Sequence, residues 1–182
     1  DRVTSATLSR YTVRAGLSDT EGRSLGGAIT LNAGTMKDGA GNDLTTTLPS
    51  VGGLGSVLVD SIVPTVSSVS APANATYIAG QNLDFTVNTS ENVTVNTAGG
   101  TPSLALTIGA TGKTASYVSG SGTSALLFRY TVEAGLSDTD GIALGGAITL
   151  NAGTMKDGAG NDLTTTLTSV GGLGSVLVDS IV

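Results

Sequence analysis

Apolar and polar residues alternate with a period of two along several short stretches of this chain. In NLDFTVNT, residues 82–89, the apolar Leu83, Phe85 and Val87 alternate with polar residues. SALLFRYTVEAG, residues 124–135, shows the same alternation from Leu126 to Val132. Alternation of this kind predicts β-strands with one buried side and one solvent-facing side. No segment shows a sustained helical period with capping residues at its ends.

Shorter candidate strands are separated by clusters of Gly, Asn, Asp and Ser, which are typical of turns. They are residues 66–70, 93–96, 103–108, 113–118, 147–151, 163–167 and 176–178. Seven or more short strands in about 119 residues predict an all-β fold, an Ig-like antiparallel β-sandwich. The pattern leaves open whether the last strand is 163–167, 176–178 or both.

The chain repeats itself at a fixed spacing. Tyr11 matches Tyr130 and Asp60 matches Asp179, and both pairs are 119 residues apart. Residues 10–63 and 129–182 differ only at the pairs Arg14/Glu133, Glu21/Asp140, Arg23/Ile142, Ser24/Ala143 and Pro49/Thr168. Solenoid units are typically about 20–50 residues long, so this period fits a whole small domain. We therefore expect sandwiches in tandem, with residues 64–182 forming a complete repeat and residues 1–63 the C-terminal half of another.

Half a sandwich would expose unpaired strand edges and an apolar face. In addition, Thr7 and Ser9 stand where the complete repeat has Leu126 and Phe128. Two explanations remain open at this point. Either the sequence cuts a longer array within a repeat, or strands of another chain complete the half repeat by β-strand complementation.

Composition and charge exclude several kinds of chemistry. The sequence has no Cys and no His, which removes disulfides, thiolates, imidazole bases and the usual zinc ligands. Its formal net charge is −6, so nucleic acids and anionic membranes would repel it. No apolar run is long enough to span a bilayer. We expect a protein that is not an enzyme and has neither a nucleic-acid partner nor a membrane-inserted segment.

Acidic residues gather in the loops. In an Ig-like sandwich, the loops after the second strand and before the last strand lie at the end where the chain enters. That end would carry Glu91, Asp157, Asn161 and Asp162; the opposite end would carry Asp138, Asp140 and Asp179; the corresponding acids of the half repeat are Asp19, Glu21 and Asp60. Head-to-tail stacking would bring such acids together, where their negative charges repel each other. A hard cation such as Ca²⁺ would neutralise these charges and hold the two repeats together.

Ordinary turn chemistry is the competing interpretation of these loops. Asp and Asn side chains often bond their own backbone and tolerate left-handed conformations. The stretch DTDG, residues 138–141, is also far from a complete EF-hand loop, which requires further ligands and a distal Glu. Junctional Ca²⁺ and simple turns therefore both remain possible at this point.

The order of several motifs resembles a known family. The linker LVDSIVPTVSSVSAPANATYIAGQNLDFTVNTSENVTV, followed by DTDGIALGGAITLNAGTMKDGAGNDL, resembles the tandem Ig-like repeats of giant secreted bacterial adhesins of the RTX type. The resemblance implies an extracellular or cell-surface extender that contacts neighbouring repeats of the same chain, with Ca²⁺ near the junctions. The implied ligand candidates are Asp60, Glu91, Asp157 and Asn161. The alternative is an extracellular filament subunit that exchanges strands with other copies of itself.

Overall fold

The computed structural model describes residues 8–181, and the chain divides into two compact units, Asp1–Ile62 and Val63–Val182. Every helix or strand element among the described residues is a β-strand. The expected all-β class is confirmed, and the mainly antiparallel sheets of the second unit have the layout of a β-sandwich.

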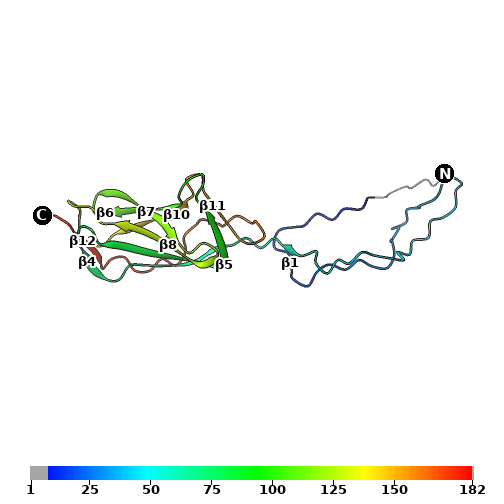
Figure 1. Cartoon of the computed structure of the whole chain (residues 1–182), viewed down its shortest axis with the longest axis horizontal. Helices are drawn as coiled ribbons and strands as arrows, with labels where there is room; N and C mark the ends of the chain where they lie inside the picture. The colour runs from blue at the N-terminus through cyan, green and yellow to red at the C-terminus, as the bar shows by residue number, and fades with distance from the viewer. Residues whose placement is uncertain (1–7, 182) are drawn as a thin grey trace. The chain divides into compact units, whose positions relative to one another are not determined.

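The second unit contains two sheets (Figure 1). The larger has the strand order β10-β6-β7-β8-β5-β11, with β3 also paired to β5, and the smaller has the order β4-β12-β9. The strands are β3 (Val66–Ser70), β4 (Ala75–Tyr77), β5 (Asn82–Asn96), β6 (Ser103–Ile108), β7 (Thr111–Ser119), β8 (Thr123–Thr131), β9 (Ser137–Asp138), β10 (Ala143–Thr149), β11 (Thr154–Lys156) and β12 (Val176–Asp179).

The core forms where β5 pairs with β8. Phe85 lies opposite Phe128 in this antiparallel ladder, and both side chains are fully buried. The Tyr117 ring from β7 meets Phe128 edge-on, with ring centroids 5.7 Å apart. Burial alternates along β5 from Leu83 onward, as the sequence period predicts. Both long alternating segments are therefore confirmed as central strands.

Other strand predictions need correction. Residues 93–96 are the end of the long β5 and not a separate strand. Residues 163–167 form no strand, because successive backbone groups bond different segments: Leu163 N–H donates to Met155, Thr164 N–H to Pro64 and Leu167 N–H to Gly146. The last strand is β12. The short strands β4 and β9 were not predicted, since two or three residues are too few to show a period.

The chain enters and leaves the second unit at opposite ends. Thr65 exchanges hydrogen bonds with Ser90, near the end of the β5–β8 ladder where Val93 pairs with Thr123. Ser180 bonds to Leu136, just beyond the other end of β8. The acidic loops predicted for each end are therefore separated by the length of the sandwich.

The first unit has little regular structure. It contains one two-stranded pair, β1 (Ser18–Asp19) with β2 (Val59–Asp60), which has the same register as β9 with β12. None of residues 8–62 is buried. Val57 is 48% exposed, whereas its counterpart Val176 is fully buried. The expected apolar face is thus present on the described part of this unit.

We predict that Phe128→Ala lowers the free energy of unfolding of the second unit by about 3–5 kcal/mol, because it leaves a cavity beside Phe85 and Tyr117. Urea titration followed by circular dichroism measures this loss. Val118→Ala on the neighbouring β7 is the control, since Val118 is exposed and the change should stay within about 0.5 kcal/mol. Equal losses in the two variants would contradict the assignment of the core.

Candidate functional site

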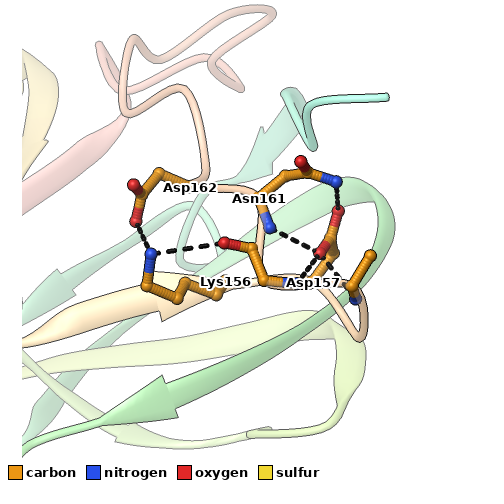
Figure 2. A network of polar contacts seen from close by, with 6 residues as sticks. Lys156, Asp157, Asn161 and Asp162 are labelled. Atoms are coloured by element: carbon orange, nitrogen blue, oxygen red, sulfur yellow. Dashed lines mark hydrogen bonds and ion pairs between the residues drawn. The ribbon is translucent and has the colours of Figure 1, made fainter. Parts of the chain in front are cut away.

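The loop after β11 is built around the Asp157 carboxylate (Figure 2). Its Oδ1 accepts hydrogen bonds from the backbone N–H groups of Ala159, Gly160 and Asn161 at 2.9, 2.7 and 2.8 Å. Its Oδ2 accepts one from the Asn161 side-chain amide at 2.7 Å. Asp157 is only 5% exposed. The four donors therefore fix the carboxylate in one orientation.

These contacts keep the carboxyl group ionised. Burial acts to raise the pKa of Asp157, but the hydrogen bonds from the Asn161 side chain and from the three backbone N–H groups outweigh it. The pKa of Asp157 therefore lies below its ordinary value of 3.8. A buried carboxylate that is charged at neutral pH is a suitable ligand for a hard cation.

The same loop occurs in the first unit. Asp38 Oδ1 accepts from the N–H groups of Ala40 and Asn42, both at 2.9 Å, and its Oδ2 accepts from the Asn42 amide at 2.8 Å. The Asn42 side-chain amide is the main cause that lowers the pKa of Asp38. Asp38 is exposed, so the loop takes this form without a sandwich around it.

A salt bridge closes the loop at its base. Lys156 Nζ lies 2.6 Å from Asp162 Oδ1 and donates to the Gly160 carbonyl at 3.3 Å (Figure 2). Lys37 and Asp43 form the same ion pair in the first unit. Asp162, a predicted ligand, thus has its charge balanced by Lys156, which makes it a weaker ligand candidate than Asp157.

The structure brings Glu91 close to Asp157. Carboxylate oxygens of these two residues lie within 4.8 Å of each other. Glu91 was expected in a loop, but it lies inside β5, next to the register shift between Asn88 and Val93. A bulge of this kind redirects side chains at the edge of a ladder. The expectation that both acids lie at the end where the chain enters is confirmed.

Asp60 lies in the segment through which the chain enters the second unit. Thr164 N–H donates to the Pro64 carbonyl at 2.9 Å, and Thr65 is bonded to Ser90, so residues 64–65 are fixed beside both acidic segments. Asp60 is four residues upstream of Pro64, which limits their separation to about 14 Å. Asp60 Oδ1 also accepts from Ile62 N–H at 3.1 Å. The covalent chain therefore sets only an upper limit on the distance from Asp60 to Pro64.

At the other end of the second unit, Asp138 acts as a brace between turns. It is 5% exposed, and its two oxygens accept from Gly109 N–H at 2.6 Å and Gly141 N–H at 2.8 Å. Gly109 belongs to the turn between β6 and β7. Among the described residues, Asp138, Asp140 and Asp179 do not form a group of three carboxylates within reach of one ion. The turn interpretation explains Asp138 fully.

In the first unit, the acid that corresponds to Asp138 also bonds to residues next to it in the sequence. Asp19 Oδ1 accepts from the N–H groups of Glu21 and Gly22 at 3.1 and 3.0 Å, and its Oδ2 lies 3.4 Å from Arg23. Glu21 itself is exposed. Asp19 therefore shapes a turn, as Asp138 does.

Comparisons with known protein families, curated proteins and solved structures find no match to this chain. The resemblance to adhesin repeats stays a prediction from the motifs. Within residues 8–181 there is no helix with the length and apolar content needed to cross a membrane.

Sequence reasoning missed the bracing role of Asp138. Its partner Gly109 is 29 residues away, and nothing local connects the two. The only available signal was the pairing of an Asp with a Gly three residues later, which is ordinary turn chemistry.

We predict that Asp157→Asn makes the second unit less sensitive to acid. The folded pKa of Asp157 is below the unfolded value, so its ionised form contributes stability above about pH 4 that is lost as the pH falls through the folded pKa. The wild-type melting temperature should therefore fall more steeply than that of the variant between about pH 5 and pH 2. Superimposable profiles for wild type and Asp157→Asn would refute this assignment.

We also predict that Asp138→Ala destabilises the second unit by about 1–3 kcal/mol, because two N–H groups lose their acceptor. Chemical denaturation with and without Ca²⁺ tests this, and the loss should be the same in both. Asp140→Ala is the matched control at an exposed position and should change stability by less than about 0.5 kcal/mol. A loss that appears only with Ca²⁺ would instead mark Asp138 as a ligand.

Proposed function

We propose that this chain is a structural, non-catalytic extender module of a secreted or cell-surface bacterial adhesin, stiffened by Ca²⁺ at the junctions between repeats. The observation that carries the proposal is the approach of Glu91 and Asp157 to within 4.8 Å at the end where the chain enters the second unit. Two carboxylates at this separation repel each other unless a cation or proton lies between them.

The geometry of the pair suits calcium. Oxygens that ligate one Ca²⁺ at 2.3–2.6 Å can be no more than about 5 Å apart, which matches this pair. Asp157 Oδ2 accepts only one hydrogen bond from within its own loop, whereas Oδ1 accepts three, so Oδ2 is the atom with room for a cation. In this proposal Asp60, four residues before Pro64, supplies a third carboxylate, and the Asn161 amide oxygen or backbone carbonyls complete the shell.

Calcium at this position would supply a crosslink between the linker and the sandwich. Asp60 precedes the second unit, whereas Glu91 and Asp157 belong to it, so one ion bound to all three would restrict the link between successive repeats. Near-identical repeats support the same role, because every junction of an array needs the same ligands. The opposite positions of Thr65 and Ser180 suit a module that adds length.

A second candidate function is an extracellular filament subunit that assembles by strand complementation between chains. The apolar side chains exposed on the first unit favour it, since a neighbouring strand could cover them. Light scattering separates the two functions, because an extender fragment stays monomeric whereas a filament subunit grows with concentration.

The calcium proposal predicts a higher melting temperature in Ca²⁺ than in excess EGTA. A ligand that binds only the folded state stabilises it by about 2.7 kcal/mol at a concentration one hundred times its Kd. Glu91→Gln and Asp60→Asn should each reduce the shift, and Asp60→Asn keeps an oxygen for the hydrogen bond from Ile62. Small-angle scattering of the full chain should show a narrower range of conformations with Ca²⁺.

Asp162→Asn is the control, since Asp162 is exposed and paired with Lys156, and it should keep the full response. Mg²⁺ should shift the melting temperature less, because it prefers a smaller and more regular shell. Identical melting curves in Ca²⁺ and EGTA would mean that the acidic loops are ordinary turns and would rule out the junction site.

A further inference from the structure

Three segments of the second unit match the pattern Asn-x-Ser/Thr, in which the Asn side chain can carry an N-linked glycan. They begin at Asn74, Asn88 and Asn92. The pattern combines the Asn amide with a hydroxyl two residues later, so an enzyme must reach both groups. Asn and Thr are frequent in this chain, so the pattern alone does not single out a site. The structure separates the three segments.

The side-chain amide of Asn88, within β5, is already engaged. Its nitrogen donates to Ser68 Oγ at 3.1 Å and to Ser70 Oγ at 3.3 Å. Strands also flank this position on both sides, because Asn88 lies opposite Ala125 of β8 and opposite Ser68 of β3. A glycan on Asn88 would therefore break two hydrogen bonds and meet a neighbouring strand on each side.

The segment that begins at Asn92 is enclosed in the same sheet. Val93 lies opposite Thr123 of β8, and Thr94 lies opposite Lys156 of β11. Val93 is fully buried, although Asn92 and Thr94 are exposed. The main chain between the amide and the hydroxyl therefore cannot enter an enzyme unless β5 opens locally.

Asn74 lies in the bend directly before β4, where conditions differ. Both Asn74 and Thr76 are exposed. The Tyr77 hydroxyl donates to the Ala73 carbonyl at 2.9 Å, which fixes the backbone on the two sides of Asn74. The two residues that the pattern requires are thus reachable from solvent in the folded protein.

The strand β4 also leaves one side of its main chain open. It is the edge strand of the order β4-β12-β9 and pairs with β12 along Ala75–Tyr77 (Figure 1). Within the described part of the chain, no strand pairs with its other side. An enzyme can therefore approach this segment without separating two strands, unlike the segments in β5.

This edge lacks the charges that commonly protect an exposed strand. Open edges can pair with other chains, and many proteins block them with charged side chains or Pro. Residues 71–83 contain no charged residue, and Ile78, directly after β4, is 55% exposed. Pro72 is buried and precedes the strand. A glycan is bulky and hydrophilic, so on Asn74 it would cover the edge in place of a charge.

We propose that Asn74 is an acceptor for N-linked glycosylation in the folded protein, and that the attached saccharide shields the open edge of β4. The donor is a sugar activated by a diphosphate that is bound to a nucleotide or a lipid. The Asn74 amide nitrogen bonds to the anomeric carbon as the bond from that carbon to the phosphate oxygen breaks. The diphosphate leaves with the electron pair, and an enzyme base takes one proton from the nitrogen. The site requires neither Ca²⁺ nor the extender role.

The test treats the full 182-residue chain with a soluble N-glucosyltransferase and UDP-glucose, and peptide mass spectrometry measures the hexose on each Asn. We expect the occupancy of Asn74 to exceed that of Asn88 and Asn92 by about tenfold or more, because β5 must open before its sites react. Short peptides of residues 70–80 and 84–96 are the unfolded controls and should react at similar rates. An equal preference for Asn74 in the peptides would overturn the structural argument.

Thr76→Val is the matched variant, because it keeps a β-branched side chain of similar shape and removes only the hydroxyl. Asn74 should then stay unmodified while the melting temperature remains that of the untreated wild type. Thr76→Ser should keep the reaction. Modification of Asn74 in Thr76→Val, or an unmodified Asn74 in the folded wild-type chain, would refute the acceptor site.

The shielding of the edge is measured separately by light scattering at high protein concentration. The glycosylated chain should associate more slowly than Asn74→Gln treated in the same way. Ile78→Lys in the untreated chain is the control, since a charge beside the edge should slow association as well. Slower association with Ile78→Lys but not with the glycan would overturn the shielding role. Equal association of all three would overturn it too.

Discussion

The pairing of β5 with β8 is the interaction on which the second unit depends. It joins the first half of the repeat to the second half and places Phe85 opposite Phe128 at the centre of the core. The first unit is a natural comparison, because residues 10–63 repeat residues 129–182 with five differences and, within the described part of that unit, only β1 and β2 form a strand pair. Its Tyr11 and Val57 are exposed, whereas Tyr130 and Val176 are buried. Burial in this fold is therefore a property of the joined halves and not of the local sequence.

The conformations of the loops, in contrast, are determined by short-range contacts. Asp38 and Asp157 each accept hydrogen bonds from the backbone and the side chain of the Asn four residues later, although only Asp157 is buried. The turns at Asn32 and Asn151 likewise share a positive φ, 46° and 51°. A carboxylate that is oriented and ionised by its own loop needs no reorganisation before it meets a cation. This preorganisation favours the proposed junction site.

Sequence reasoning succeeded where a feature is periodic or local. Alternation identified β5 and β8, and the position of the loops in a sandwich placed Glu91 and Asp157 at one end. It failed where long-range partners decide the outcome. Residues 163–167 look like a strand but bond three different segments, and Asp138 braces a glycine 29 residues away. Such partners are set by the packing of distant strands, which no local pattern records.

The path of the chain through the second unit determines how it would carry a load. Thr65 enters at one end of the sandwich and Ser180 leaves at the other, and β12 lies parallel to β4. Tension between the two ends would pull β4 and β12 in opposite directions along their length. Their hydrogen bonds would then be sheared together rather than unzipped one at a time. Mechanical strength would therefore come from strand direction and could exceed what the modest size of the core suggests.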